Sequence, residues 1–393
     1  MRTAIATLLI NMSVCGASPS APKESSTPAP PTLRERLTVS PPAASPREPI
    51  GLVGRDSMMC AIRKDAPPAC IGEIGLALEP ADPSTDDGRY SRTHAERPVA
   101  LDELDLASLE ANDYARCVLD SDAVAQCWRR DVARHQGQFP EALPFRSVRD
   151  VAAEDQTCVV LTSGELRCTG DETCGGRNAT PDYDISQVVT VPGIDTARIV
   201  AKALHMGCVI REDSTVACWG KTGENAECVP EAKAVPDLDD VVDIAVNSYS
   251  ACGLRADNRV FCWGLNSRGA LGSSEPLYSW TPLEVTDAHP AVKLQNTPDG
   301  FAVLRTDGSI VAWGGDLLSG EGSPPQRLPF EHPAVEMVAL SGMVCALLDD
   351  GSIKCEGRKV RSAEAAGRPR PPFEGKTPWV EAPLYRLAPR PTH

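Results

Sequence analysis

Short runs of alternating apolar and polar residues recur along the chain, and each pair of runs flanks a polar tip. The clearest copy is ACGLRADNRVFCWG, which begins at Ala251. Alternation over a few residues predicts a β-strand with one buried face, and a tip of Asp followed by Asn or Gly predicts a tight turn. Each unit is therefore expected to form an antiparallel β-hairpin with a three-residue loop that contains one left-handed residue.

The hairpin unit occurs seven times, and in six copies two cysteines stand ten residues apart, one in each arm. The pairs are Cys60/Cys70, Cys117/Cys127, Cys158/Cys168, Cys208/Cys218, Cys252/Cys262 and Cys345/Cys355. The remaining copy, FAVLRTDGSIVAWG from Phe301, has Ala302 and Ala312 at both cysteine positions. Because this copy has lost both cysteines together, we infer that the two positions form a disulfide in the other six.

A second pattern precedes each hairpin and predicts two more short strands in every unit. It consists of Leu-Pro or Val-Pro, spaced apolar residues, and a strand of small residues such as residues 244–246. The first cysteine positions are separated by 57, 41, 50, 44, 50 and 43 residues, a spacing typical of four-stranded propeller blades. One tryptophan follows the second cysteine position in four copies and is expected to pack between neighbouring sheets: Trp128, Trp219, Trp263 and Trp313.

These units resemble the repeat of the regulator of chromosome condensation family. The pattern C-x-L-x-x-D-G-x-V-x-C-W-G followed by N-x-x-G-x-L-G is most complete between Cys252 and Gly272. The resemblance implies an all-β fold, a seven-bladed β-propeller of four-stranded antiparallel blades with hairpin disulfides inside the blades. A propeller must close its ring, so the segment from Thr377 is predicted to pair with the first copy at residues 50–60 and complete blade 1. A free C-terminal tail is the alternative.

The N-terminal region has the features of an export signal followed by a tether. Residues 1–17 contain Arg2, a short apolar stretch from Ala4 to Ile10, and small residues around Cys15. Two processing routes stay open, attachment of a lipid to Cys15 or cleavage after Ala17. Residues 18–47 are rich in Pro, Ser and Ala and are predicted to form a disordered linker, with the propeller spanning residues 48–393. A misassigned start codon with an unstructured N-terminus is the alternative.

Composition and charge favour an oxidising compartment. The chain has 15 cysteines in 393 residues and a formal net charge of −15. Disulfides persist outside the reducing cytosol, so we expect an exported protein in the periplasm, on the outer-membrane surface or in the medium. The negative charge argues against nucleic acid and anionic membranes as partners, which leaves a lipid on Cys15 as the expected membrane contact. Cys174 and Cys228 follow consecutive hairpins and are predicted to form a bridge between blades.

The sequence lacks the common catalytic and metal-binding motifs. C-x-x-C, H-E-x-x-H, G-x-S-x-G and the P-loop pattern do not occur, so no catalytic residue, metal site or cofactor is assigned. The acidic segment DPSTDDG from Asp82 is interpreted as a solvated loop, and His205 as a core or turn residue. A second acidic segment is interpreted as a solvated face, with a site for a basic partner as the alternative. It contains Asp237, Asp239, Asp240 and Asp243.

These features favour an exported, non-catalytic, monomeric propeller that binds a protein or a glycan through its loops. The binding residues stay unassigned. An inhibitor of a secreted hydrolase is one alternative, because β-lactamase inhibitory protein of the type II kind has a similar seven-bladed fold. The loop aromatics that could serve such an inhibitor are Tyr90, Tyr183, Tyr249, Tyr278 and Trp280. A hydrolytic enzyme on a propeller scaffold is the other alternative. The exchange activity of the nuclear family member is not transferred, because export, disulfides and negative charge oppose it.

Overall fold

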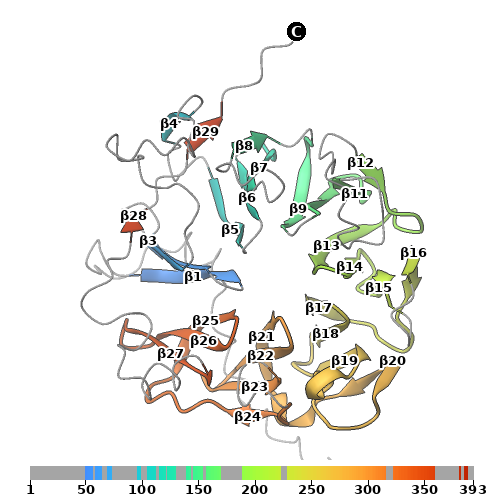
Figure 1. Ribbon diagram of the computed structural model, residues 1–393, viewed down its shortest axis with the longest axis vertical. Coiled ribbons are helices and arrows are strands. Elements are labelled where there is room, and N and C mark those ends of the chain that lie inside the picture. The colour runs from blue at the N-terminus through green and yellow to red at the C-terminus, as the bar shows by residue number, and fades with distance from the viewer. Residues whose placement is uncertain are drawn as a thin grey trace, which may run out of the picture.

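Seven β-sheets stand in a ring and form the blades of a propeller (Figure 1). The computed structural model describes residues 49–55, 58–63, 69–72, 95–98, 104–111, 115–120, 122–129, 139–142, 145–153, 156–169, 188–222, 228–315, 322–358, 380–381 and 385–387. Within them, six blades have four antiparallel strands and one has three. The predicted seven-bladed, all-β propeller is confirmed. The predicted signal (1–17) and linker (18–47) lie outside the described residues.

The strands of each blade are as follows. Blade 1 contains β1 (Pro49–Arg55), β2 (Met58–Arg63), β3 (Ala69–Gly72) and β28 (Val380–Glu381). Blade 2 contains β5 (Leu104–Ala111), β6 (Ala115–Asp120), β7 (Ala125–Arg129) and β8 (Phe139–Ala142). Blade 3 contains β9 (Val148–Ala152), β10 (Cys158–Leu161), β11 (Leu166–Thr169) and β12 (Val188–Thr190). Blade 4 contains β13 (Ala197–Lys202), β14 (Met206–Arg211), β15 (Val216–Lys221) and β16 (Cys228–Ala234).

The chain continues in the same way through the last three blades. Blade 5 contains β17 (Val241–Val246), β18 (Ser250–Arg255), β19 (Val260–Leu265) and β20 (Tyr278–Glu284), with the short 3₁₀ helices η2 (Ser267–Gly269) and η3 (Thr286–Ala288) in its loops. Blade 6 contains β21 (Ala291–Thr297), β22 (Gly300–Arg305), β23 (Ile310–Gly314) and β24 (Gln326–Arg327). Blade 7 contains β25 (Ala334–Leu340), β26 (Met343–Leu348) and β27 (Ile353–Glu356). A separate two-stranded sheet pairs β4 (Ala95–Pro98) with β29 (Tyr385–Leu387).

The ring closes where blade 7 packs on blade 1. In every blade the first strand lies nearest the ring axis and the later strands follow outward (Figure 1). The inner strands β25 and β1 are neighbours, and Leu52 and Met59 of blade 1 share an apolar cluster with Val338 and Leu340 of blade 7. The burial of apolar side chains between the two blades therefore joins the first blade to the last.

The C-terminal segment adds a strand to blade 1, but at a different edge from the one expected. β28 pairs antiparallel with Ala69 and Cys70 of β3, not with residues 50–60. The reason is geometric. β2 is flanked on both sides, and β1 lies nearest the ring axis, so β3 carries the outward-facing edge of the blade.

The hairpin turns of blades 3 to 7 have the predicted three-residue loop with a left-handed residue. In blade 4 the carbonyl of Arg211 accepts a hydrogen bond from the N–H of Ser214, whose φ is 64°, and the N–H of Arg211 donates to Thr215. The same two hydrogen bonds recur in four other turns. Their left-handed residues are Gly164, Asn258, Gly308 and Gly351. A residue with positive φ at this position gives the strands the twist that lets the hairpin arms pair in register.

Disulfides join directly opposed residues of the hairpin arms, as the fold prediction requires. They are Cys117–Cys127, Cys158–Cys168, Cys208–Cys218, Cys252–Cys262 and Cys345–Cys355, with Cα atoms 4.0–4.1 Å apart. Cys60 is also disulfide-bonded and lies opposite Cys70. In blade 6, Ala302 and Ala312 oppose each other in the same register. Cys228 is disulfide-bonded, but Cys174 and Cys15 lie outside the described residues, so the Cys174–Cys228 bridge stays a prediction.

Three of the four tryptophans that follow the second cysteine position fill the space between adjacent blades. Trp219, Trp263 and Trp313 are fully buried. Each shares an apolar cluster with the preceding blade: Trp219 with Leu166, for example, and Trp313 with Val260. Their predicted role in packing between sheets is confirmed, while the side chain of Trp128 lies outside the described residues.

The double substitution Ala302→Cys and Ala312→Cys is expected to add a hairpin disulfide to blade 6, because these residues are paired as the cysteines are elsewhere. Closing so short a loop should stabilise the protein by about 1–3 kcal/mol. Thermal unfolding of the oxidised variant would then show a higher Tm than the wild type, and the single variant A302C would show no such rise. If the two new cysteines form a disulfide and Tm does not rise, the result contradicts this expectation.

Gly207→Ala should destabilise blade 4, because a Cβ at this position would lie 2.6 Å from Cε2 of the buried Trp219 indole. Gly253→Ala is the matched control, since its Cβ would meet only side chains, at 3.4 Å or more. We expect G207A to lose about 1–3 kcal/mol of unfolding free energy through overpacking. Chemical denaturation would measure both losses, and an equal loss in the two variants would show that the indole is not the cause.

Candidate functional site

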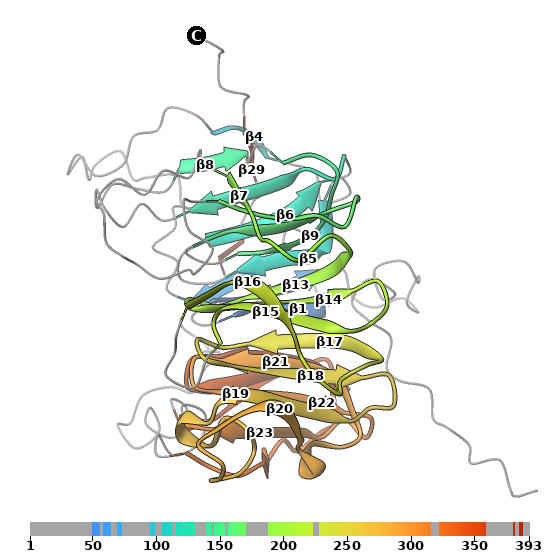
Figure 2. The same ribbon diagram turned by 90° about the vertical axis from the view of Figure 1, so that its right-hand side faces the viewer.

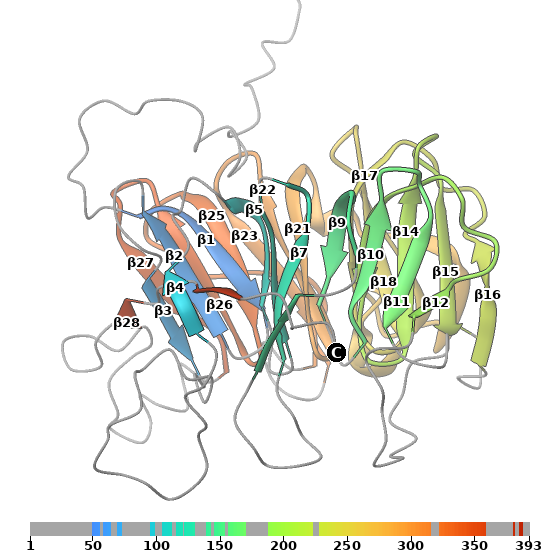
Figure 3. The ribbon, with the colours of Figure 1, turned by 90° about the horizontal axis from the view of Figure 1, so that it is seen from above.

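One face of the ring is built from the hairpin turns and from the linkers that enter each next blade. We call it the turn face. It comprises turns 161–165, 211–215, 255–259, 305–309 and 348–352 and linkers 191–196, 235–240, 285–290 and 328–333. The strands run from this face to the opposite one, and the blades stand side by side around the ring (Figures 2 and 3).

The turn face is held in place by a backbone hydrogen bond that repeats from blade to blade. The carbonyl of the left-handed turn residue accepts from the first N–H of the next inner strand, as from Val241 to Ser214 at 3.0 Å. The same bond joins Ala197 to Gly164, Ala291 to Asn258 and Ala334 to Gly308 at 2.8–2.9 Å. Turns fixed at both ends present their side chains at defined positions, which favours binding because little order has to be gained.

Aspartates at the turn tips stabilise these turns. Asp213 accepts from the N–H and hydroxyl of Thr215, and Asp307 accepts from the N–H and hydroxyl of Ser309. The hydroxyl of Thr215 lowers the pKa of Asp213, and the hydroxyl of Ser309 lowers the pKa of Asp307. Both carboxylates are therefore ionised at neutral pH and add negative charge to the turn face.

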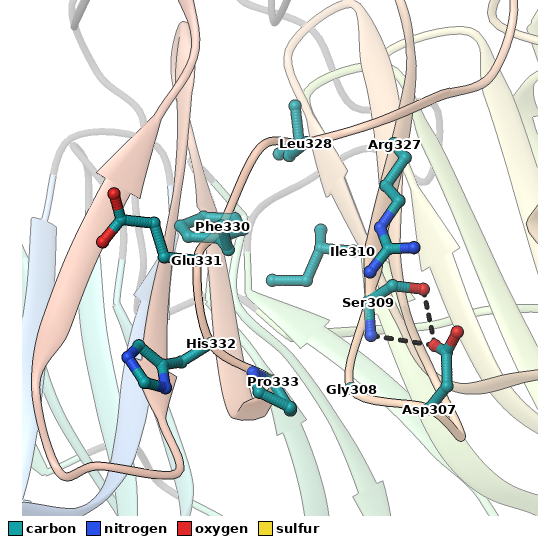
Figure 4. Close-up of a pocket in the computed structure, with 10 residues that line it drawn as sticks. All are labelled: Asp307, Gly308, Ser309, Ile310, Arg327, Leu328, Phe330, Glu331, His332 and Pro333. Atoms are coloured by element: carbon teal, nitrogen blue, oxygen red, sulfur yellow. Dashed lines mark hydrogen bonds between the residues drawn. The ribbon is translucent and has the colours of Figure 1, made fainter.

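A surface cavity of about 70 Å³ lies on the turn face at the junction of blades 6 and 7 (Figure 4). It is formed by the blade 6 turn, by β24 and by the linker into blade 7. Its lining residues are Asp307, Gly308, Ser309, Ile310, Arg327, Leu328, Phe330, Glu331, His332 and Pro333. Ile310 and Leu328 are buried and Phe330 is half-buried, whereas Asp307, Arg327 and Glu331 are exposed. The surface that lines the cavity is therefore mainly polar, and Ile310 and Leu328 lie buried beneath it.

A histidine explains why this junction is hollow. In the preceding junction His289 Nε2 accepts from the N–H of Val260 at 3.1 Å, and its side chain is 19 % exposed. His332 holds the equivalent linker position but turns away, with Nδ1 3.4 Å from Asp349 Oδ1 and a side chain 52 % exposed. Ile310 holds the position in blade 6 that Val260 holds in blade 5. His332 therefore does not lie over Ile310 as His289 lies over Val260. The outward position of His332 leaves the space above Ile310 open.

The four aspartates of the second acidic segment do not form one exposed surface. Asp239 and Asp240 form ion pairs with Arg255 at 3.2 and 3.7 Å, and Asp237 is exposed. Asp243 belongs to inner strand β17, where its carboxylate accepts from Ile244 N–H at 2.9 Å and from Leu294 N–H of blade 6 at 3.2 Å. Burial raises the pKa of Asp243. Asp243 therefore joins two blades, and the alternative of a basic-partner site formed by all four aspartates loses its basis.

The loop aromatics considered for an inhibitor site mainly connect blades 4 and 5. The hydroxyl of Tyr278 donates to the Thr222 carbonyl at 2.9 Å, and Nε1 of Trp280 donates to the Ala234 carbonyl at 3.4 Å. Tyr249 lies 5.1 Å from His205, ring centre to ring centre, at the face opposite the turn face. His205 is a turn residue, as interpreted. Tyr90 and Tyr183 lie outside the described residues, as does the acidic loop from Asp82.

Sequence reasoning missed most of the cavity. The repeat pattern places Asp307 at a turn tip without assigning it a binding role, and Arg327, Phe330 and Glu331 carry no motif. The two walls come from a hairpin tip and from a linker some twenty residues later, which only the blade junction brings together. Across the described ranges no group of three or more His, Cys, Asp or Glu side chains is placed to hold a metal ion. No helix there is long and apolar enough to span a membrane.

Residues 241–270, which cover β17 to β19 and η2, match the model of the Regulator of chromosome condensation (RCC1) repeat. Blade 5 is thus similar to an RCC1 repeat. Blades 3, 4, 6 and 7 share its hairpin turn. Blades 1, 2, 3, 4 and 7 share a half-cystine at the same position in the hairpin. No curated protein matches the sequence.

Solved RCC1 propellers have the same fold. A structure of yeast RCC1 (Prp20) with Kap60 bound is 13 % identical, with a TM-score of 0.58, and the match covers 80 % of this chain and 83 % of that one. Prp20p from Saccharomyces cerevisiae is 14 % identical, with a TM-score of 0.56 and coverage of 80 % and 85 %. Human WBSCR16 is 16 % identical, with a TM-score of 0.54 and coverage of 76 % and 86 %. These similarities show the RCC1-like fold.

Acid should destabilise the propeller through its turn aspartates. The pKa of Asp213 and of Asp307 is lowered on folding, so their contribution to stability is full above the unfolded pKa of about 4 and is lost as the pH falls through the lower folded pKa. The variant D213N/D307N keeps an Oδ1 acceptor at both turns. Its Tm should therefore fall less steeply than that of the wild type below pH 4. Parallel Tm curves for the two proteins would contradict this assignment.

Proposed function

We propose that the protein is exported and acts, without catalysis, as a disulfide-stabilised propeller that binds a protein partner through its turn face. The observation that carries this proposal is the set of hairpin disulfides. The hairpin cysteines whose side chains the structure describes, all except Cys70, are between 0 and 3 % exposed, so their sulfurs are part of the blade cores. Bonds of this kind form and persist in an oxidising compartment.

The N-terminal sequence supports the same compartment. An apolar stretch behind Arg2, followed by small residues around Cys15 and a Pro-rich segment, fits a signal and tether. In this proposal Cys15 either carries the lipid that holds the propeller at a membrane or is removed with the signal. The periplasm, the outer-membrane surface and the medium are the compartments that fit.

A protein partner is favoured by the nature of the turn face and by the fold. The turns are fixed to neighbouring blades, and their charged side chains are exposed at the rim. Propellers of the same fold from yeast are described with Kap60 bound and with binding properties to Gsp1p and histones. We therefore propose a protein rather than a glycan as the partner of this chain.

The test uses the full-length chain produced in a bacterial cell, with a photo-crosslinking amino acid in place of Glu331 on the turn face. The same residue in place of Ser274, which is exposed on the opposite face, is the control. We expect extracytoplasmic protein whose hairpin cysteines resist a thiol label without reduction, and a discrete protein adduct from position 331 only. Mass spectrometry of the mature N-terminus would show whether residue 15 is lipidated or removed.

Two results would overturn the proposal. Cytoplasmic protein with labelled hairpin thiols would remove the case for export. Adducts of equal yield from positions 331 and 274, or from neither, would remove the case for a binding turn face.

A further inference from the structure

We propose that the ring opens at the junction between blades 7 and 1, which we call the seam, and that this opening starts at the turn face. The seam is the contact of inner strand β25 with inner strand β1. The proposal goes beyond the proposed function, because a motion of the ring requires neither export nor a partner. It starts from the hydrogen bond that fixes each turn to the next blade.

The recurring hydrogen bond cannot form at the seam. Of the six junctions whose turn the structure describes, five have a hydrogen bond from the first N–H of the inner strand to the carbonyl of the left-handed turn residue. At the seam the turn residue is Gly351, and the inner strand begins at Pro49. Pro49 pairs with Arg63 as Ala334 pairs with Leu348, so both hold the same position in their blades. Proline has no N–H, and the carbonyl of Gly351 therefore lacks the donor that Ala334 supplies to blade 6.

The turn of blade 7 also lacks the cover that other turns receive from the next linker. A Cβ on Gly308 would lie 2.5 Å from Cβ of Pro333, and a Cβ on Gly164 would lie 2.6 Å from the carbonyl oxygen of Asp195. Both neighbours belong to the linker that enters the next blade. A Cβ on Gly351 would have no described atom within 4 Å. In the described part of the chain, this turn is thus held to blade 1 by neither the bond nor the contact.

Blade 1 also has no side chain at the position that links inner strands elsewhere. This position is the third of the inner strand, where Asp150 of blade 3 accepts from the N–H of Val200 in blade 4 at 2.7 Å. In blade 6 it is Lys293, which forms an ion pair with Glu336 at the same position in blade 7. In blade 1 it is Gly51. Blade 1 therefore cannot pair with Glu336 from the other side as Lys293 does.

The contacts that close the seam lie farther from the turn face. Inner strands begin at this face, and Leu52 is the fourth residue of β1, whereas Val338 and Leu340 are the fifth and seventh residues of β25. These three side chains share one apolar cluster and are between 0 and 2 % exposed. Local opening begins where the fewest interactions have to be broken. An opening of the seam therefore starts at the turn face and reaches Leu52 first.

The experiment measures how often two equivalent buried positions become accessible in the native protein. Leu52→Cys places a thiol at the seam, and Leu294→Cys places one at the fourth position of β21, at the junction of blades 5 and 6. The two leucines are 0 and 3 % exposed. Each oxidised full-length variant is treated with an alkylating reagent, and mass spectrometry of the peptides gives the labelling rate at the new thiol. We expect labelling at position 52 to be about tenfold faster, because one hydrogen bond is worth a factor of about two to ten and the linker contact is missing as well.

Two further substitutions exchange the properties of the junctions. Pro49→Ala supplies the missing N–H, so it should slow labelling at position 52 about two- to tenfold and leave position 294 unchanged. Ala291→Pro removes the hydrogen bond to the carbonyl of Asn258, which is 2.9 Å long, and should speed labelling at position 294 by a similar factor. It should leave position 52 unchanged. A loss of overall stability would instead speed labelling at both positions.

Equal labelling rates at positions 52 and 294 would overturn the proposal, because the ring would then open as one unit. An unchanged rate at position 52 after Pro49→Ala would also overturn it, since the missing bond would not be the cause. If a cysteine variant fails to fold, amide exchange of the wild type over residues 49–63 and 291–305 replaces the labelling. Faster exchange over residues 49–63 would support the seam, and equal exchange would overturn it. None of these results depends on export or on crosslinking at position 331, so this proposal and the proposed function fail separately.

Discussion

The propeller depends on one recurring hydrogen bond, which at five described blade junctions runs from the first N–H of an inner strand to the carbonyl of the left-handed turn residue in the blade before it. That carbonyl points toward the next blade only when the turn has its left-handed residue in place. Asp or Ser at the tip stabilises that conformation by accepting from the backbone two residues on. Local turn chemistry thus determines how one blade is placed on the next.

The disulfides and tryptophans act on the same hairpins from inside. Each cystine joins two residues that the hairpin already places opposite each other. It therefore acts mainly by restricting the conformations of the unfolded chain and changes the folded structure little. Each tryptophan of blades 4 to 6 then fills the gap to the preceding blade. Blade 6 keeps the hairpin and its Trp313 without a cystine, and Ala302 and Ala312 remain fully buried. The sulfurs are therefore an addition to a fold that packing and turn geometry define.

This rigidity bears on function. A ring whose turns are fixed to neighbouring blades presents charged side chains without having to order them on binding. Most acidic groups at the rim are used within the structure: Asp239 and Asp240 pair with Arg255, and Asp243 joins two inner strands. At the cavity of blades 6 and 7, Asp307 likewise accepts from the N–H and hydroxyl of Ser309, and Glu331 is exposed beside it.

The blade count, the hairpins, the cystine register and the buried tryptophans follow from the amino-acid order, because all of these features are local or periodic. Residues ten apart in a hairpin meet whatever the rest of the chain does, and alternation sets which side chains are buried. The tertiary structure alone decided the edge on which β28 pairs, the inward position of Asp243 and the existence of the cavity. Each of these depends on how neighbouring blades are placed, and a turn and a linker from different repeats come together only after the ring has closed.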